Sequence, residues 1–358
     1  MKTTSAPAPT RQQTVAPEAT TMKAVLQTQY GPPDMLRLAD VPKPTVGENG
    51  VLIRVRAAAV NHADLVYITG SPLLARLAFG LRAPKQPVRG RDVAGEVQAV
   101  GRKVTRVRPG DAVYAEVETG SFAEYTSAPE SAVFRKPTNL SFEQAAAVPV
   151  SARTALQGLA HVAQVRPGQR VLINGASGGV GTFAVQIAKA HGAEVTGVCS
   201  TRNADLVRSL GAHHVVDYTQ NDFTRTGEQY DVIFDSIGNH SLKRLRGALT
   251  RTGTLVLSSG TGGRVLGPMG RILHALVLSP LVPQSLRTSA KTKATLDDVT
   301  VLIESGRLRP VIDRTYPLSE TREGLRYFAD EHARAKIVIS VSTDGQTLDG
   351  QSSNGQIR

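Results

Sequence analysis

The segment Asn174–Gly181 (NGASGGVG) constrains the possible folds of this chain more than any other feature. It follows an apolar run at Val171–Asn174 and leads into Val180–His191, where apolar residues recur with the period of an α-helix. A glycine-rich turn between a strand and a helix presents unpaired backbone N–H groups and the positive end of the helix dipole, which together bind pyrophosphate. The segment therefore predicts a dinucleotide site on a parallel sheet.

Three small residues in this loop meet separate requirements of such a site. Ala176 allows a tight turn, Gly178 lets the backbone approach the pyrophosphate, and Gly181 lets the helix pack closely on the strand. Ala176 departs from the usual G-x-G-x-x-G pattern, which has glycine at that position. A further strand at Glu194–Cys199 favours a nucleotide site over the alternative of a merely flexible glycine-rich loop.

The residues that follow this second strand bear on the choice of cofactor. NAD sites place Asp or Glu there to accept a hydrogen bond from the ribose 2′-hydroxyl, and such an acid would repel a 2′-phosphate. This chain has Ser200, Thr201 and Arg202, which can donate hydrogen bonds or pair with a phosphate. We therefore expect NADPH rather than NADH as the cofactor. The alternative is a capped helix N-terminus with a solvent-facing arginine.

The pattern along the chain changes twice. Short β-like runs separated by Gly and Pro indicate a barrel-like β domain, and strands alternating with helices after Arg170 indicate a doubly wound parallel sheet. The strand at Lys336–Val341 returns to the first domain. We expect an α/β protein with a disordered leader (1–21), the first part of a β-rich catalytic domain (22–148), a cofactor domain (149–285), a return segment that completes the catalytic domain (286–342) and a disordered tail (343–358).

Composition limits the possible partners. No run approaches the roughly 18 apolar residues that span a bilayer. The most apolar stretch, Ile272–Val282, predicts a buried element or a partner contact, so we expect no membrane partner. The net charge of +12 fits either a basic surface or attraction of an anionic cofactor, and no reading motif for nucleic acid accompanies it, so we expect no nucleic-acid partner. The single cysteine, Cys199, excludes an internal disulfide and fits a cytoplasmic protein.

An ordered set of motifs resembles the medium-chain dehydrogenase/reductase superfamily, in particular its zinc-independent quinone-oxidoreductase-like (zeta-crystallin-like) branch. The resemblance covers nearly all of residues 22–341 and implies a GroES-like β-rich catalytic domain, a Rossmann domain, an active site between them and a homodimer. The motifs that carry it, besides Asn174–Gly181, are Val60–Asp64, Gly90–Gly95, Pro109–Asp111, Ala147–Leu156 and His332–Val338.

The resemblance also bears on metal binding. Zinc-dependent relatives have Cys at the position of Asn61, His at that of Arg91 and a third ligand near Val150. Neither Val nor a cationic Arg ligates Zn²⁺, so three protein ligands are not available at these positions. We expect no metal, with His62 and Asp64 as two ligands at best.

Without a Lewis acid, the favoured substrates are quinones and α,β-unsaturated carbonyls, which accept hydride because conjugation delocalises the charge onto oxygen. Asn61 and Tyr67 are candidates to orient that oxygen by hydrogen bonds, although Tyr67 lies one residue away from the family's usual tyrosine. The resemblance places Thr154 close to the nicotinamide. It also assigns the remaining cofactor contacts to Ser177, Gly179, Val180, Tyr218, Gly238, Ser258, Ser259 and Lys336.

Two other functions remain open at this stage. One is a zinc-free, NADP-dependent dehydrogenase or reductase of another carbonyl–alcohol pair. The other is a cofactor-sensing RNA-binding protein on the same scaffold, which the positive charge allows.

Overall fold

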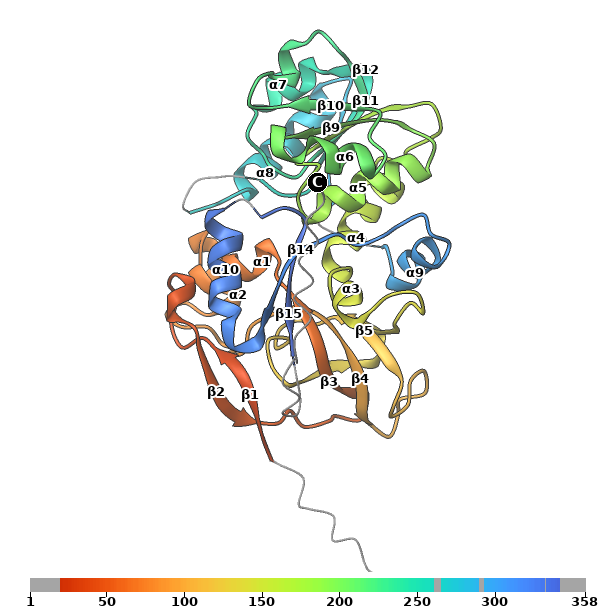
Figure 1. The fold of residues 1–358 in the computed structure, drawn as a ribbon. Helices are drawn as coiled ribbons and strands as arrows, with labels where there is room; N and C mark the ends of the chain where they lie inside the picture. The colour runs from red at the N-terminus through yellow and green to blue at the C-terminus, as the bar shows by residue number, and fades with distance from the viewer. Residues whose placement is uncertain (1–19, 261–264, 290–292, 332, 342–358) are drawn as a thin grey trace, which may run out of the picture.

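The computed structural model describes residues 20–260, 265–289, 293–331 and 333–341, and the expected leader and tail lie outside these ranges except for Thr20 and Thr21. The chain forms two bodies, with the parallel sheet and its helices above and the β-rich body below (Figure 1). The N-terminal and C-terminal segments of the described chain both belong to the lower body, so the upper one is an insertion between them. This confirms the predicted α/β organisation, in which a β-rich domain is interrupted by a domain with a parallel sheet.

The lower, catalytic domain contains a seven-stranded sheet in the order β14-β15-β3-β4-β5-β7, with β6 pairing β3, and a separate hairpin-like pair β1-β2. Strand β3 is central because it pairs β4 along its whole length, β6 at its start and β15 at its end. The strands are β1 (Thr21–Leu26), β2 (Arg37–Pro42), β3 (Gly50–Ala59), β4 (Asp92–Val100), β5 (Ala112–Glu116), β6 (Tyr125–Pro129), β7 (Val133–Arg135), β14 (Ile312–Pro317) and β15 (Lys336–Ser340).

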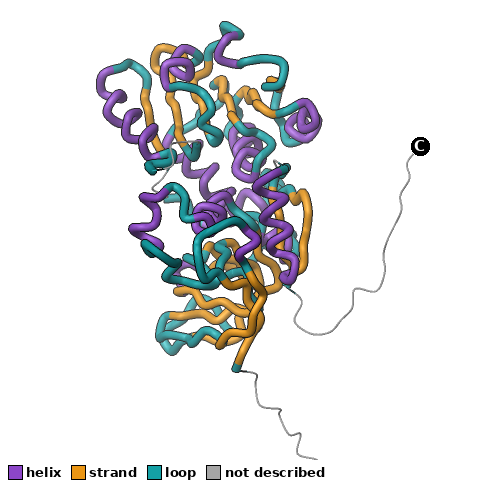
Figure 2. Tube along the Cα trace, turned by 90° about the vertical axis from the view of Figure 1, so that its left-hand side faces the viewer, coloured by secondary structure: helices purple, strands orange, loops and turns teal. Residues whose placement is uncertain are grey.

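The upper, cofactor domain is a six-stranded parallel sheet in the order β10-β9-β8-β11-β12-β13. Helices lie on both of its sides (Figure 2). Its strands are β8 (Arg170–Asn174), β9 (Glu194–Cys199), β10 (His214–Asp217), β11 (Tyr230–Asp235), β12 (Leu249–Leu257) and β13 (Ser285–Thr288). Because β13 pairs with β12, this sheet extends slightly beyond the boundary expected at residue 285.

Ten α-helices are assigned in the described ranges. They are α1 (His62–Thr69), α2 (Arg76–Phe79), α3 (Phe142–Ala146), α4 (Pro149–Leu156), α5 (Gly179–Ala190), α6 (Ala204–Ser209), α7 (Leu242–Gly247), α8 (Met269–Leu278), α9 (Leu296–Glu304) and α10 (Thr321–Asp330). The described part of the chain holds no helix that is long and apolar enough to cross a membrane.

Local sequence explains where two of these helices begin. Ser141 and Gln144 form a capping box at the start of α3, in which the Gln144 N–H donates to the Ser141 hydroxyl and the Ser141 N–H donates to the Gln144 side chain. Helix α5 begins after Gly178 and buries Phe183, Ala184 and Ile187 against the sheet.

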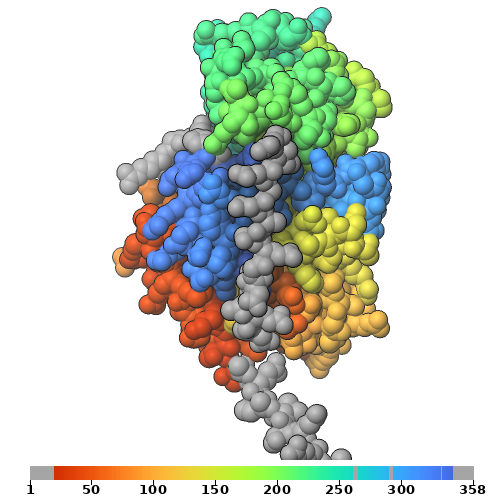
Figure 3. Space-filling view, in the orientation of Figure 1, coloured from red at the N-terminus to blue at the C-terminus, as the bar shows by residue number. Residues whose placement is uncertain are grey.

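The C-terminal segment joins the two domains. The Ala335 N–H donates to the Ser177 carbonyl at 2.8 Å, and Ala335 forms a bridge with Gly178, so the residue before β15 lies against the glycine-rich loop. Farther along the same surface, α10 packs beside N-terminal elements (Figure 3), where Arg326 pairs with Asp34. The return segment therefore places the catalytic sheet directly below the loop after β8.

Candidate functional site

A cleft of about 960 Å³ runs along the glycine-rich loop between the two domains. Helix α1 of the catalytic domain borders one side, and the ends of β8 and β9 border the other. The residues that line it are His62, Leu65, Asn174, Gly175, Ser177, Gly178, Gly179, Val198, Cys199, Ser200, Arg202, Asn203, Tyr218, Ile237, Asn239, Phe328, Ala329, Asp330, Glu331 and Ala333.

The loop after β8 has no room for larger residues at the expected positions. A Cβ at Gly181 would lie 2.0 Å from the Gly175 carbonyl oxygen, which fixes glycine there. The Ala176 methyl lies opposite Gly197 of β9, where an added Cβ would be only 3.0 Å away. Alanine therefore fits in place of the usual glycine, because Gly197 of the neighbouring strand has no side chain at that point.

A buried carboxylate that the sequence analysis missed holds the loops around the cleft together. Asp235, at the end of β11, is fully buried, and its Oδ1 accepts hydrogen bonds from Asn174 Nδ2 at 2.8 Å and the Gly238 N–H at 3.0 Å. Its Oδ2 accepts from Arg271 of α8 at 2.6 Å. Gly238 has φ +78, a conformation that glycine adopts without strain. Since Asp235 bonds three separate segments, its charge is compensated and the turn at Gly238 is fixed.

The tip of β9 carries the residues expected to select the cofactor. Ser200 and Arg202 line the cleft, and Arg202 donates to the Glu331 carbonyl at 2.9 Å. The Thr201 hydroxyl instead bonds the Asp217 carboxylate. Asn203, which was not predicted, donates to both Ser177 and Ser200 at 3.2 Å and so connects this tip to the glycine-rich loop.

The catalytic candidate Asn61 lies in a buried network between the domains. Its Oδ1 accepts from Lys336 Nζ at 2.6 Å, and Lys336 Nζ also donates to Asp92 Oδ2 at 3.1 Å. The other Asp92 oxygen accepts from the Val150 N–H at 3.0 Å. The Lys336 ammonium therefore lies beneath Asn61, and the cofactor contact that the resemblance implied for Lys336 stays a prediction. The aliphatic part of the Lys336 side chain passes the start of α5, since its Cδ would lie 3.1 Å from a Cβ placed on Gly179.

Asp64 supports Asn61 from below. It is 1% exposed, and its Oδ2 accepts the Asn61 N–H at 2.7 Å. Desolvation, reinforced by the negative charge of Asp92, raises the pKa of Asp64 to about 7, against the opposing effects of the Asn61 hydrogen bond and of Lys336 and Arg91. Asp64 therefore changes its charge near neutral pH.

Tyr67 lies on α1 in aromatic and cationic surroundings. Its ring centroid is 3.9 Å from that of Phe79 on α2, and the guanidinium groups of Arg89 and Arg91 lie 5.8 and 6.0 Å from it. Burial raises the pKa of Tyr67. Thr154, the third catalytic candidate, donates its hydroxyl to the Val150 carbonyl at 2.7 Å within α4.

The positions of the zinc ligands in relatives are engaged in other interactions. Asn61 bonds Lys336, Arg91 pairs with Glu116 at 2.6 Å, and Val150 contributes only its backbone. Among the residues that the structure describes, no group of three or more His, Cys, Asp or Glu side chains could hold a metal ion. The expectation of a metal-free site stays a prediction.

The structure therefore brings together Ser177, Gly178, Gly179, Ser200, Arg202 and Tyr218 around the cleft. Ala176 is buried behind the loop, Val180 and Gly181 lie in the first turn of α5, and Thr201 faces Asp217. Ser258 and Ser259 are half-buried just after β12. The sequence analysis gave the Asn174 side chain no separate role and missed Asn203, Asp235 and Arg271, because single polar residues at strand ends or on a distant helix give no pattern in the sequence.

Comparisons with known proteins cover both domains. Residues 47–138 match the model described as alcohol dehydrogenase GroES-like domain, and residues 210–339 match the one described as zinc-binding dehydrogenase. The chain is 32% identical over 335 residues to an Arabidopsis thaliana NADPH-dependent alkenal/one oxidoreductase, covering 89% of this chain and 79% of that protein. It is 30% identical to the quinone oxidoreductase of Homo sapiens, covering 84% and 92% of the two chains. The structure of the quinone oxidoreductase from Coxiella burnetii superposes with a TM-score of 0.79 at 30% identity, covering 90% of this chain and 100% of that one.

Proposed function

Because this chain belongs to the medium-chain dehydrogenase/reductase superfamily, in its zinc-independent quinone-oxidoreductase-like branch, we propose that it is an NADPH-dependent reductase of quinones or α,β-unsaturated carbonyls. The observation that carries the proposal is the cleft itself, which runs along a dinucleotide loop and reaches His62, the neighbour in sequence of Asn61 in the buried network. The relatives named for alkenal and quinone reduction support the substrate class.

The residues around the loop fit a dinucleotide. A Cβ on Gly181 would clash with the loop backbone, so the close approach of helix and strand depends on glycine. The Asn203 Oδ1 atom is buried without a hydrogen-bond partner in the described part of the chain, and it lies in a residue that lines the cleft. A ligand that donates a hydrogen bond at this tip would satisfy it. A bound nicotinamide cofactor would supply the hydride.

NADPH is proposed over NADH on the residues at the tip of β9. The first residue after this strand is Ser200, where an NAD site has an acid, and Arg202 lines the same wall of the cleft. The Asp217 carboxylate lies close by, but Thr201 and Thr219 hydroxyl groups bond it. Arg202 would pair with the 2′-phosphate by a charge-assisted hydrogen bond.

The side chains of the catalytic domain would orient the acceptor. Lys336 holds the Asn61 carboxamide oxygen, and the amide nitrogen donates one N–H to the Ala59 carbonyl at 3.3 Å, so its second N–H would face a substrate oxygen. The Arg89 guanidinium beside Tyr67 adds positive charge to this wall, whereas that of Arg91 is paired with Glu116. A positive wall stabilises the negative charge that develops on a quinone or enone oxygen during reduction.

Steady-state rates with NADPH against a quinone, an enone and a simple ketone test this function. Turnover of the ketone alone would favour the alternative of another carbonyl–alcohol pair, and cofactor binding without turnover together with salt-dependent RNA affinity would favour a cofactor-sensing role. For the cofactor, Arg202→Ala should weaken NADPH binding at least tenfold while leaving NADH binding nearly unchanged. Equal losses for both cofactors would remove Arg202 from the proposed 2′-phosphate site.

We further propose a homodimer in a reducing compartment. Strand β13 ends the six-stranded sheet, and its outer edge pairs with no other strand of the described chain, so a second copy could extend the sheet there. Cys199 is the single cysteine of the chain and is buried, which suits a reducing compartment such as the cytoplasm. Sedimentation of the purified protein would show whether a dimer forms.

A further inference from the structure

One surface of the molecule exposes most of its large apolar side chains. Sixteen large apolar side chains are exposed in the described ranges, and eleven of them lie in two short segments. We call these eleven the apolar surface: Leu73, Leu74, Leu77 and Leu81 around α2, and Val265, Leu266, Met269, Leu273, Leu276, Val277 and Leu281 around α8. A patch of this kind marks an interaction site, because soluble surfaces rarely gather so many apolar side chains.

The two segments form one continuous surface across the domains. The Leu74 N–H donates to the Val265 carbonyl at 3.1 Å, and a Cβ on Gly267 would lie 2.6 Å from Pro72. Helices α2 and α8 therefore lie on the same side of the molecule (Figure 1). The sequence analysis expected a buried element or partner contact at Ile272–Val282, but most of its large side chains face solvent.

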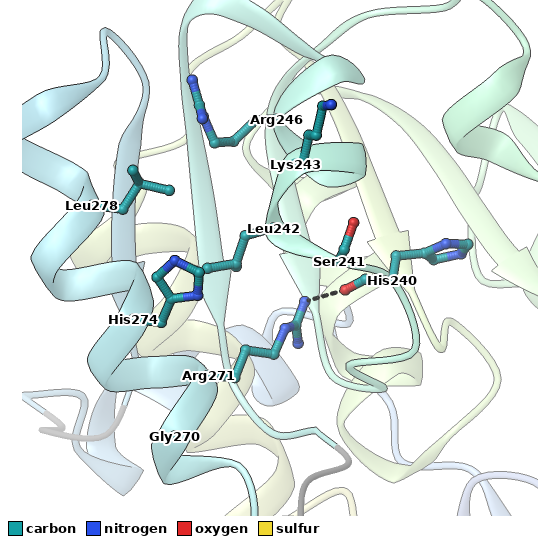
Figure 4. A pocket seen from close by; sticks show the side chains of 9 residues that line it. All are labelled: His240, Ser241, Leu242, Lys243, Arg246, Gly270, Arg271, His274 and Leu278. Carbon is teal, nitrogen blue, oxygen red and sulfur yellow. Dashed lines mark hydrogen bonds between the residues drawn. The ribbon is translucent and has the colours of Figure 1, made fainter.

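Helix α8 is anchored to the cofactor domain along one face, so other side chains of the helix face solvent. Ala275 is buried, and Arg271 reaches inward to the Asp235 carboxylate and the His240 carbonyl. Figure 4 shows Arg271, His274 and Leu278 on the side of α8 that faces α7. Leu273 and Val277 are 53% and 70% exposed on the opposite side. An amphipathic helix held in this way lies parallel to the surface on which it docks.

The two sequence stretches that carry the apolar surface have charged residues of one sign only. Residues 65–91 and 236–296 contain no Asp or Glu, although both stretches contain several Lys and Arg. Arg82, Lys85, Lys243 and Arg287 are exposed in these stretches. Between α7 and α8 lies an open pocket of about 630 Å³, lined by His240, Ser241, Leu242, Lys243, Arg246, Gly270, Arg271, His274 and Leu278 (Figure 4). The surface is therefore complementary to an anionic partner.

This surface also adjoins the candidate site. Leu77 and Leu81 flank Phe79, whose ring stacks on Tyr67 at 3.9 Å. Helix α2 thus separates the exposed leucines from the wall that would orient the acceptor. A partner docked here would lie close to Tyr67, on the other side of α2.

We propose that the apolar surface docks the enzyme peripherally on an anionic lipid bilayer and that the acceptor enters from that bilayer. Entry of the acceptor from the bilayer rests on the proposed function, because it requires a quinone with an apolar tail, which dissolves in membranes. Apolar side chains would enter the headgroup region while Arg82, Lys85 and Lys243 meet lipid phosphates. A second copy fits less well, because two such surfaces face to face would bring like charges together without a carboxylate from either stretch. The expectation of no membrane partner, drawn from the lack of a spanning segment, is thereby revised.

The test is flotation of the full-length protein with vesicles of phosphatidylcholine alone or mixed with phosphatidylglycerol. Binding is expected only to the anionic vesicles and should fall as salt rises. The double variant Leu273→Glu/Val277→Glu should bind at least tenfold more weakly, as should Arg82→Glu/Lys85→Glu. The matched control Leu38→Glu/Val301→Glu changes two exposed apolar residues outside the surface and should bind like the unaltered protein.

Two further measurements separate the possible outcomes. Reduction of a water-soluble quinone should be the same in the Leu273→Glu/Val277→Glu variant, whereas reduction of a long-tailed quinone in anionic vesicles should fall at least tenfold. Lack of turnover with both quinones and with an enone would refute the proposed function but leave the vesicle-binding result interpretable. If the unaltered protein does not float with anionic vesicles, or if the variant only converts a dimer to monomers, the proposal is wrong and the surface joins two copies.

Discussion

Replacing Asp64 by asparagine should change how the stability of the protein depends on pH. Burial raises the pKa of Asp64 to about 7 from its ordinary value of 3.8, so the unfolded chain loses this proton at a lower pH than the folded chain. The contribution of Asp64 to stability is therefore complete below pH 3.8, falls as pH rises towards 7 and stays constant above it. At about 1.36 kcal/mol per pH unit, ionisation of Asp64 lowers the free energy of unfolding by about 2 kcal/mol between roughly pH 5.5 and 8.5. The Asp64→Asn variant keeps an oxygen that accepts the Asn61 N–H. It has no carboxyl group to ionise, so it does not lose this stability as pH rises.

Urea unfolding at several values across this pH range would measure the effect. The unfolding free energy of the variant should decline by about 2 kcal/mol less than that of the unaltered protein. Asp298→Asn is the matched control, because Asp298 accepts the Thr295 N–H in the same capping position of α9 but is exposed. Hydrogen bonds from Thr295 lower the pKa of Asp298, so its effect on stability should be independent of pH in this range. Parallel pH curves for the unaltered protein and Asp64→Asn would refute the reasoning.

Three other predictions follow from the cofactor loop and the candidate site. Gly181→Ala should abolish NADPH binding measured by fluorescence titration, because its Cβ would lie 2.0 Å from the Gly175 oxygen, and binding of unaltered strength would contradict this packing. Ala335→Gly should raise the unfolding free energy by about 1 kcal/mol in urea, because Ala335 has φ +59, and an unchanged midpoint would show that the turn costs nothing. Elemental analysis should find no stoichiometric zinc and activity should survive chelation, whereas loss of activity that zinc restores would refute a metal-free site.

The features that the sequence alone determined are those that depend on neighbouring residues. The loop Asn174–Gly181 requires only a strand, a tight turn and a helix start, and the capping box at Ser141 needs only four consecutive residues. The glycine requirement at Gly181 was likewise predicted, because the packing of helix on strand is local. The alternation of strands and helices then indicated the parallel sheet.

The tertiary structure alone decided what joins distant parts of the chain. Lys336 bonds Asn61 across 275 positions of sequence, a contact that no local pattern indicates, and the cofactor contact that the resemblance implied for Lys336 stays a prediction. Arg271 reaches Asp235 from α8 because the helix folds back over the end of β11. The apolar run at Ile272–Val282 has the same hydrophobicity whether it is buried or exposed, since exposure depends on which face the rest of the fold covers. Local backbone chemistry therefore determined the cofactor loop. Long-range packing decided which charged groups lie beneath Asn61 and which apolar side chains stay exposed.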